Sequence, residues 1–133
     1  MKEFKYQEIA KKIIGAAMKV HATLGNVFFE IIYQIALAME FKKAGLMFVQ
    51  KFWMPIFYGG VIIGKRKVNF FVENLISGEL KAKAIIEPAH FLHARNYLEV
   101  HNVEATLLLN FGNISLENKR IENVKYDPDL KAV

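Results

Sequence analysis

The chain has 133 residues, of which 53% are hydrophobic and 23% charged, and it contains no cysteine. This length suits one domain with one core, and the composition is that of a folded chain. The absence of cysteine excludes disulfide scaffolds, thiol nucleophiles and zinc sites built on cysteine. The 18 Lys and Arg residues outnumber the 13 Asp and Glu residues, so the net charge of +5 favours a polyanionic partner. We expect a single domain over residues 1–133, with a tail after about residue 122.

The sequence contains no candidate targeting or membrane-spanning segment. The first five residues alternate charged and apolar side chains and lack the apolar core of a secretory signal. The longest stretch without Asp, Glu, Lys or Arg, from Phe52 to Gly64, has 13 residues, whereas a membrane-spanning helix needs about 20. We therefore expect no membrane partner and a cytoplasmic location.

Two helices are predicted in the N-terminal third. Apolar residues recur at helical spacing from Ile9 to Leu24, and Gly25-Asn26 follows as a stop signal. From Phe28 to Phe41 nearly every position is apolar. This pattern predicts a second helix that is buried on most of its circumference.

Short runs of aromatic and β-branched residues follow and predict strands. The first two are joined across Gly59-Gly60, a hairpin signal, and Pro55 places the first at an edge or a bulge. Residues 64–67 either interrupt the run or continue it. The predicted strands are Phe48–Tyr58, Val61–Ile63, Val68–Val72, Leu75–Ala84 and Ala105–Phe111, with a helix from Pro88 through Leu98 and an edge element from Asn118.

Three polar residues conflict with apolar surroundings, and such conflicts are often functional. Glu30 either faces a cleft or uses the positive end of its helix. Glu79 and Lys81 share one strand face by the period of two, although an ordinary surface ion pair would show the same spacing. Asn69 points away from Glu79 if the turn at Glu73-Asn74 has two residues, and lies opposite it on one face if the loop has three.

Aromatic and basic residues surround these positions. His90, His93, Tyr97 and His101 form one stripe along the predicted third helix. Two imidazoles a turn apart suit zinc, but no third ligand with a recognised spacing accompanies them, so a polar flank beside a cleft is favoured. Residues 64–83 carry five basic residues against two acidic ones, which is the charge that phosphate attraction requires.

A series of short motifs runs from Ile9 to about Arg120. The motifs are Val20-His21, Leu24-Gly25, Glu30-Ile31-Ile32-Tyr33, Met54–Tyr58, Val72-Glu73-Asn74, Glu79-Leu80-Lys81-Ala82, Asn96-Tyr97-Leu98, Asn110-Phe111-Gly112, and Ser115-Leu116-Glu117 with Lys119-Arg120. Together, in this order, they resemble the GxxExxY family, small proteins assigned to the PD-(D/E)XK nuclease superfamily. The resemblance implies an α/β fold with a restriction-endonuclease-like core, a mixed sheet of about four strands flanked by helices.

The resemblance also implies a site. In that superfamily a helix Glu, a strand Asp and the Glu of a Glu-x-Lys strand hold divalent ions, and the Lys supports the attacking water. These roles fall on Glu30, Asn69, Glu79 and Lys81, and His93 stands at a further catalytic position where Gln is usual. The expected metal ligands are thus Glu30, Asn69 and Glu79, the expected cofactor is Mg²⁺ or Mn²⁺, and the expected partner is DNA or RNA.

The departures from the family pattern fall on the same chemistry. Asn69 stands where the family has Asp and offers one neutral amide oxygen, so we expect weak ion binding at most. Val27 replaces the Gly that gives the family its name. One hypothesis is a metal-dependent nuclease that is weakened or inactive in this chain. The other is a non-catalytic module that binds nucleic acid or a protein partner through its basic face. The high apolar content of so small a domain also favours a homodimer.

Overall fold

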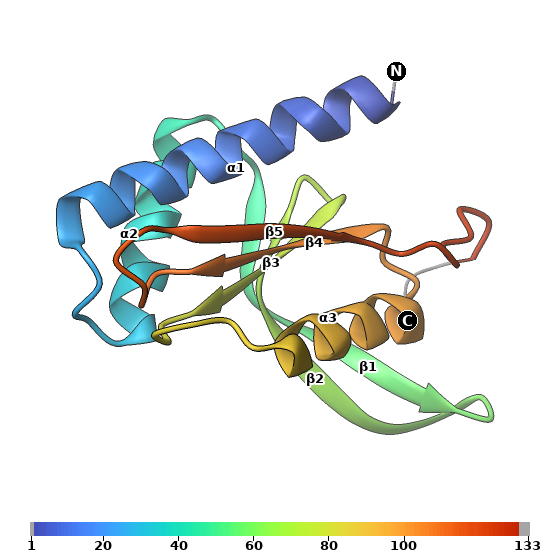
Figure 1. Ribbon diagram of the computed structural model, residues 1–133. Helices are drawn as coiled ribbons and strands as arrows, with labels where there is room; N and C mark the ends of the chain where they lie inside the picture. The colour runs from blue at the N-terminus through green and yellow to red at the C-terminus, as the bar shows by residue number, and fades with distance from the viewer. Residues whose placement is uncertain (1, 131–133) are drawn as a thin grey trace.

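A computed structural model describes residues 2–130, with side chains described from Lys5 onward. Over this range three helices and five strands follow one another in the order α1, α2, β1, β2, β3, α3, β4, β5 (Figure 1). Their bounds are α1 Lys2–Leu24, α2 Glu30–Lys43, β1 Phe48–Tyr58, β2 Val61–Val72, β3 Ile76–Lys81, α3 Pro88–His101, β4 Ala105–Asn110 and β5 Glu117–Glu122.

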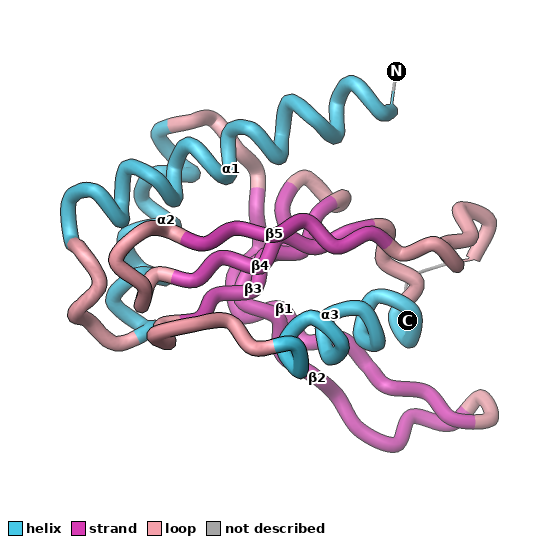
Figure 2. Tube along the Cα trace, viewed as in Figure 1, coloured by secondary structure: helices cyan, strands magenta, loops and turns pink. Residues whose placement is uncertain are grey.

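The strands form one mixed sheet with helices on both faces, as the sequence predicts. The strand order is β1-β2-β3-β4-β5, in which β3 and β4 are parallel and all other neighbours are antiparallel. Two parallel neighbours need a crossover connection, and α3 provides it. Helices α1 and α2 cover one face of the sheet and α3 covers the other (Figure 2). The edge element expected from Asn118 is β5, a fifth strand beyond the four expected for the core.

Each face of the sheet has its own apolar core. The larger cluster joins α1 and α2 to alternate residues of β2, β3 and β4, and Tyr33, Phe41 and Phe70 are among its fully buried members. The smaller cluster lies under α3 and includes Met54, Val68 and Leu98. The two-sided burial fixes which strand residues point toward α2 and which toward α3.

Helix α2 is buried on one side only, so the prediction that most of its circumference is covered is wrong. Tyr33, Leu37 and Phe41 are buried, but Ile31, Ile35 and Met39 follow one another at intervals of four and are 46%, 54% and 57% exposed. The apolar sequence alone could not reveal this, because α1 and the sheet cover only the inner side of the helix.

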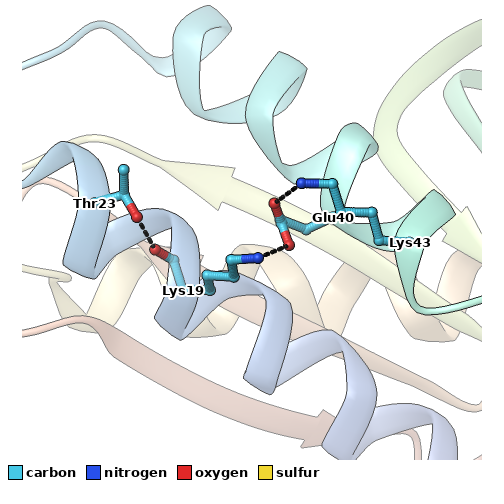
Figure 3. A network of polar contacts seen from close by, with 4 residues as sticks. All are labelled: Lys19, Thr23, Glu40 and Lys43. Carbon is cyan, nitrogen blue, oxygen red and sulfur yellow. Dashed lines mark hydrogen bonds and ion pairs between the residues drawn. The ribbon is translucent and has the colours of Figure 1, made fainter.

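A small polar network ties α1 to α2. The Glu40 carboxylate accepts from the ammonium groups of Lys19 at 3.2 Å and Lys43 at 3.3 Å (Figure 3). The hydroxyl of Thr23 donates to the backbone carbonyl of Lys19 one turn earlier. The hydrogen bond from Lys19, with smaller effects of Lys43, holds the pKa of Glu40 below its usual value. The network orients the two helices that stand over the larger core.

The β1–β2 hairpin is long and turns through two glycines. Gly59 and Gly60 both have positive φ, at 58° and 80°, which is the conformation that a tight hairpin turn needs. Strand β2 runs without a break, so residues 64–67 continue the strand, which is one of the two alternatives that the sequence allows. Strand β1 lies at the sheet edge, which confirms the interpretation of Pro55. No helix within residues 2–130 is long and apolar enough to cross a membrane.

Candidate functional site

Strands β2 and β3 part at Asn69, and the side chain of this residue fills the gap. Their pairing runs from Val72–Ile76 to Phe70–Gly78 around a three-residue loop, so the three-residue alternative is the one observed. Continued by one residue, this register sets Asn69 opposite Glu79. The Asn69 Oδ1 accepts from the backbone N–H of Leu80 at 2.9 Å, and its Nδ2 donates to Gln34 Oε1 on α2 at 3.2 Å.

Although Asn69 and Glu79 are opposite in register, their side chains engage different sides of the sheet. Val68 packs in the core under α3, whereas Phe70, two residues later, packs in the core under α2. Residues two apart on a regular strand share a face, so β2 is irregular here, opposite Lys51 with its positive φ of 52°. Asn69 consequently turns to α2, and the expectation that it shares one face with Glu79 is wrong.

Glu79 forms an ion pair with Arg66 on the α3 side of the sheet. The Arg66 guanidinium donates to Glu79 Oε1, and both side chains are only 15% exposed. The Cζ atom of Arg66 lies 3.7 Å from the ring centroid of Tyr97 on α3, so the guanidinium is stacked on an aromatic face. Burial raises the pKa of Glu79, and Arg66 and, more weakly, Lys81 oppose that rise. The ion pair is thus the main source of stabilisation for a buried carboxylate.

Lys81 and the histidines of α3 complete a cavity beside this pair. A cavity of about 80 Å³ is lined by Arg66, Glu79, Lys81, His90, His93, Ala94, Tyr97 and Leu108. His90 Nδ1 accepts from the backbone N–H of Glu87, so the neutral imidazole carries its proton on Nε2. Three members of the predicted stripe, His90, His93 and Tyr97, therefore line the cavity. His101 is buried at the end of the helix and lines an adjoining cavity, which shares Arg66, Glu79 and Tyr97 with this one.

Glu30 is the first residue of α2 and is exposed. Phe29 precedes it as the N-cap and makes no side-chain capping bond. Within the described residues, no hydrogen bond or ion pair holds the Glu30 carboxylate. Its charge contributes to the raised pKa of Glu79, so the two acids lie within electrostatic range of each other. Glu30 is therefore near the site without being held in it.

The residues expected to bind a divalent ion do not fit one in this arrangement. The Asn69 oxygen accepts a backbone N–H, and Glu79 is paired with a guanidinium. Among residues 2–130, no group of three His, Cys, Asp or Glu side chains is placed to hold a metal ion. Mg²⁺ prefers several hard oxygen ligands, anionic ones above all. In this site the guanidinium of Arg66 lies beside the Glu79 carboxylate, where such an ion would be needed.

Sequence reasoning missed two residues that shape the site. Arg66 stood out only as one of several basic residues, and Gln34 did not stand out at all. Arg66 could have been assigned to the face of Val68 by alternation had residues 64–67 been taken as strand. The sequence signal for Gln34 was a polar residue in an apolar helix, one turn after Glu30 on the same side. The structure shows that Gln34 is buried, with 5% of the residue exposed.

A comparison with protein-family models matches residues 7–122 to the PD-(D/E)XK nuclease superfamily. The match spans most of the chain, and the mixed sheet with helices on both faces agrees with the core of that superfamily. The chain therefore belongs to the PD-(D/E)XK nuclease superfamily. Neither a curated protein nor a solved structure matches it significantly.

Proposed function

We propose that this domain binds nucleic acid through phosphate groups and does so without a divalent ion in its site. The observation that carries the proposal is the Arg66–Glu79 ion pair stacked on Tyr97. It joins the carboxylate of the Glu-x-Lys motif to a cation of the chain itself. Of the two hypotheses from the sequence, the non-catalytic module therefore has more support than the metal-dependent nuclease, and its proposed partner is DNA or RNA.

The cavity beside the ion pair has suitable chemistry for a phosphate. A guanidinium has five N–H donors in a planar fork that matches phosphate oxygens, and the contact with Glu79 uses only one nitrogen of Arg66. The Lys81 ammonium lines the same cavity, as do the rings of His90 and His93. A cavity needs about 10–15 Å³ to hold one water molecule, so this cavity of about 80 Å³ has room for a phosphate group.

Binding tests the proposal directly. Labelled single-stranded and duplex oligonucleotides would be titrated with the protein in EDTA and in Mg²⁺, over a series of salt concentrations. We expect the same affinity in both buffers and a fall in affinity with salt, as counterion release requires. Lys81→Met should lower the affinity and reduce the slope of log affinity against log salt by about 0.7–0.9. Arg95→Gln, which removes an exposed cation on α3 outside the cavity, is the matched control.

Cleavage assays address the competing hypothesis. The same oligonucleotides would be incubated with Mg²⁺ or Mn²⁺ and wild type, Asn69→Asp or Lys81→Ala. We expect no cleavage by the wild-type chain. Metal-dependent cleavage that is lost in Lys81→Ala would overturn the proposal in favour of the nuclease, and a failure to bind any oligonucleotide in EDTA at low salt would overturn it as well.

A further inference from the structure

The β1–β2 hairpin carries a distinct charge pattern. No Asp or Glu occurs from Leu46 to Val72, a stretch that includes both strands and their turn. The same stretch contains four cations, Lys51, Lys65, Arg66 and Lys67. Arg66 is paired with Glu79, but the hairpin has no acid of its own to compensate its three lysines, and such a surface attracts polyanions.

Alternation along β2 divides these cations between the two faces of the hairpin. Arg66 is opposite Met54, and both point toward α3, where Met54 is 4% exposed and Arg66 reaches Glu79. Lys67 is opposite Trp53 and Lys65 is opposite Pro55, so these residues occupy the other face. The cavity proposed to bind phosphate and the face that carries Lys65 and Lys67 are therefore on opposite sides of the hairpin.

Trp53 lies between the two lysines of the second face. The Nζ atoms of Lys65 and Lys67 are 5.1 Å and 5.6 Å from the centroid of the indole ring, and Trp53 is 51% exposed. Cation–π contact explains why the lysines lie over the ring. It does not explain why a large aromatic surface stays open to solvent on a segment without a single acid.

We propose that Trp53, Lys65 and Lys67 form a binding site for single-stranded nucleic acid, in which an unpaired base stacks on the indole and the lysines contact the flanking phosphates. The inference rests on the proposed function and names its substrate class. Stacking on an exposed aromatic ring needs a base face that a duplex keeps covered, and ammonium groups beside the ring supply the phosphate contacts. Because β1 is the edge strand, a single strand that wraps around this edge can contact both Trp53 and the Arg66 cavity.

The chain offers a direct probe, because Trp53 is its one tryptophan. Intrinsic fluorescence would be followed while the protein is titrated with a thymidine oligonucleotide, and separately with a duplex. We expect quenching by the single strand that saturates together with binding measured through a label on the oligonucleotide. Equal quenching and equal affinity for the duplex would overturn the single-strand assignment.

Variants separate stacking from charge. Trp53→Ala should weaken single-strand binding about tenfold and Trp53→Phe much less, because a phenyl ring still stacks. Lys65→Gln with Lys67→Gln should lower the salt slope by about 1.4, twice the value for one contact with a single strand. The control is Lys11→Gln with Lys12→Gln, which removes the same charge from the exposed side of α1. The control should keep the quenching, and a thermal melt of each variant followed by circular dichroism would verify its fold.

The outcomes distinguish this inference from the proposed function. Binding that persists with no change in Trp53 emission, and no effect of the hairpin variants, would overturn the hairpin site and leave the Arg66 cavity as the binding site. The same conclusion would follow if Lys81→Met lost binding while the hairpin variants kept it. An emission shift on anionic lipid vesicles but not on oligonucleotides would identify a membrane surface instead and would also overturn the inference.

Discussion

At the scale of single residues, Asn69 stabilises the point where the sheet divides. Its side chain satisfies the backbone N–H of Leu80 and the side-chain carbonyl of Gln34 at once. Asn69→Ala would leave both groups without these partners, so we expect it to lower the free energy of unfolding by about 1–3 kcal/mol. Urea denaturation of the variant and the wild type would measure the loss.

Asn69→Asp tests whether the same position can bind metal. Within the described residues Gln34 Nε2 is buried without a partner, and rotating that amide would let it donate to the carboxylate that the substitution introduces. We therefore expect the variant to fold, at some cost from repulsion with Glu79. Because the side chain at position 69 lies on the α2 side, away from Glu79, we expect Mg²⁺ to change the melting temperatures of the variant and the wild type equally. A larger rise in the variant would show that position 69 is a ligand position.

The Arg66–Glu79 pair predicts a pH-dependent stability. The pKa of Glu79 is higher in the folded chain than in the unfolded chain, where carboxyl groups titrate near about 4.3. The proton on Glu79 therefore stabilises the folded chain fully below that pH, and this stabilisation is lost as the pH rises through the pKa of Glu79 in the folded chain. Arg66→Met removes the partner that lowers this pKa, so the decline with rising pH should become steeper.

At neutral pH, Arg66→Met should cost about 3–5 kcal/mol because it leaves a buried carboxylate unpaired. Replacing both partners, Arg66→Met with Glu79→Gln, removes that charge and should recover most of the loss. Chemical denaturation between about pH 4 and pH 7 would compare the three proteins. If Arg66→Met were as stable as the wild type at pH 7, the ion pair would not be what stabilises the buried carboxylate of Glu79.

At the scale of elements, the chain that leaves β3 is held by the end of β4. Asn110 accepts from the backbone N–H of Lys83 at 2.9 Å and donates to its carbonyl at 2.8 Å. Gly112 lies so close that a Cβ there would be 2.3 Å from the Lys83 nitrogen and 2.5 Å from the Ala82 carbonyl carbon. This close approach gives a physical reason for the Asn110-Phe111-Gly112 motif.

Gly112→Ala should therefore destabilise the fold by about 3 kcal/mol or more, because backbone atoms cannot move aside as a side chain can. Gly64→Ala is the matched control, since nothing lies within 4 Å of a Cβ at that position. We expect the control to change stability by less than about 0.5 kcal/mol. Thermal melts would compare the two variants, and similar melting temperatures would contradict the prediction.

The order of elements was predictable because periodicity and turn residues are local signals. The hairpin at Gly59-Gly60, the helix opened by Pro88 and the shared face of Glu79 and Lys81 follow from spacing alone. The pairing of Arg66 with Glu79 does not, because it depends on the register between two strands. The turn of Asn69 toward α2 depends in turn on an irregularity opposite Lys51, which no alternation pattern in β2 could reveal.

At the scale of the whole molecule, the chain exposes more surface than its mass requires. Its accessible area is 8196 Å², whereas a monomer of this size exposes about 7,100 Å². The outer stripe of α2, with Ile31, Ile35 and Met39, is an apolar surface that a second copy would cover.

We accordingly expect the protein to form a homodimer through α2. Light scattering across a range of concentrations should give a mass near twice that of the chain, and Ile35→Glu should reduce it to one chain. Ile114→Glu changes an 86% exposed isoleucine in the loop between β4 and β5 and should leave the mass unchanged. A monomer at every concentration would refute the dimer.

The hydrogen bond between Asn69 and Leu80 also makes one backbone amide a reporter of the site. The acceptor for Leu80 is a side chain, not a carbonyl of the neighbouring strand. Its proton can therefore exchange with deuterium after a local opening in which Asn69 swings away, while the rest of the sheet stays paired. Amides inside β4 need a larger opening and should exchange more slowly. Oligonucleotide bound beside Glu79 should slow the exchange of Leu80 selectively, so the occupancy of the site becomes readable at a single proton.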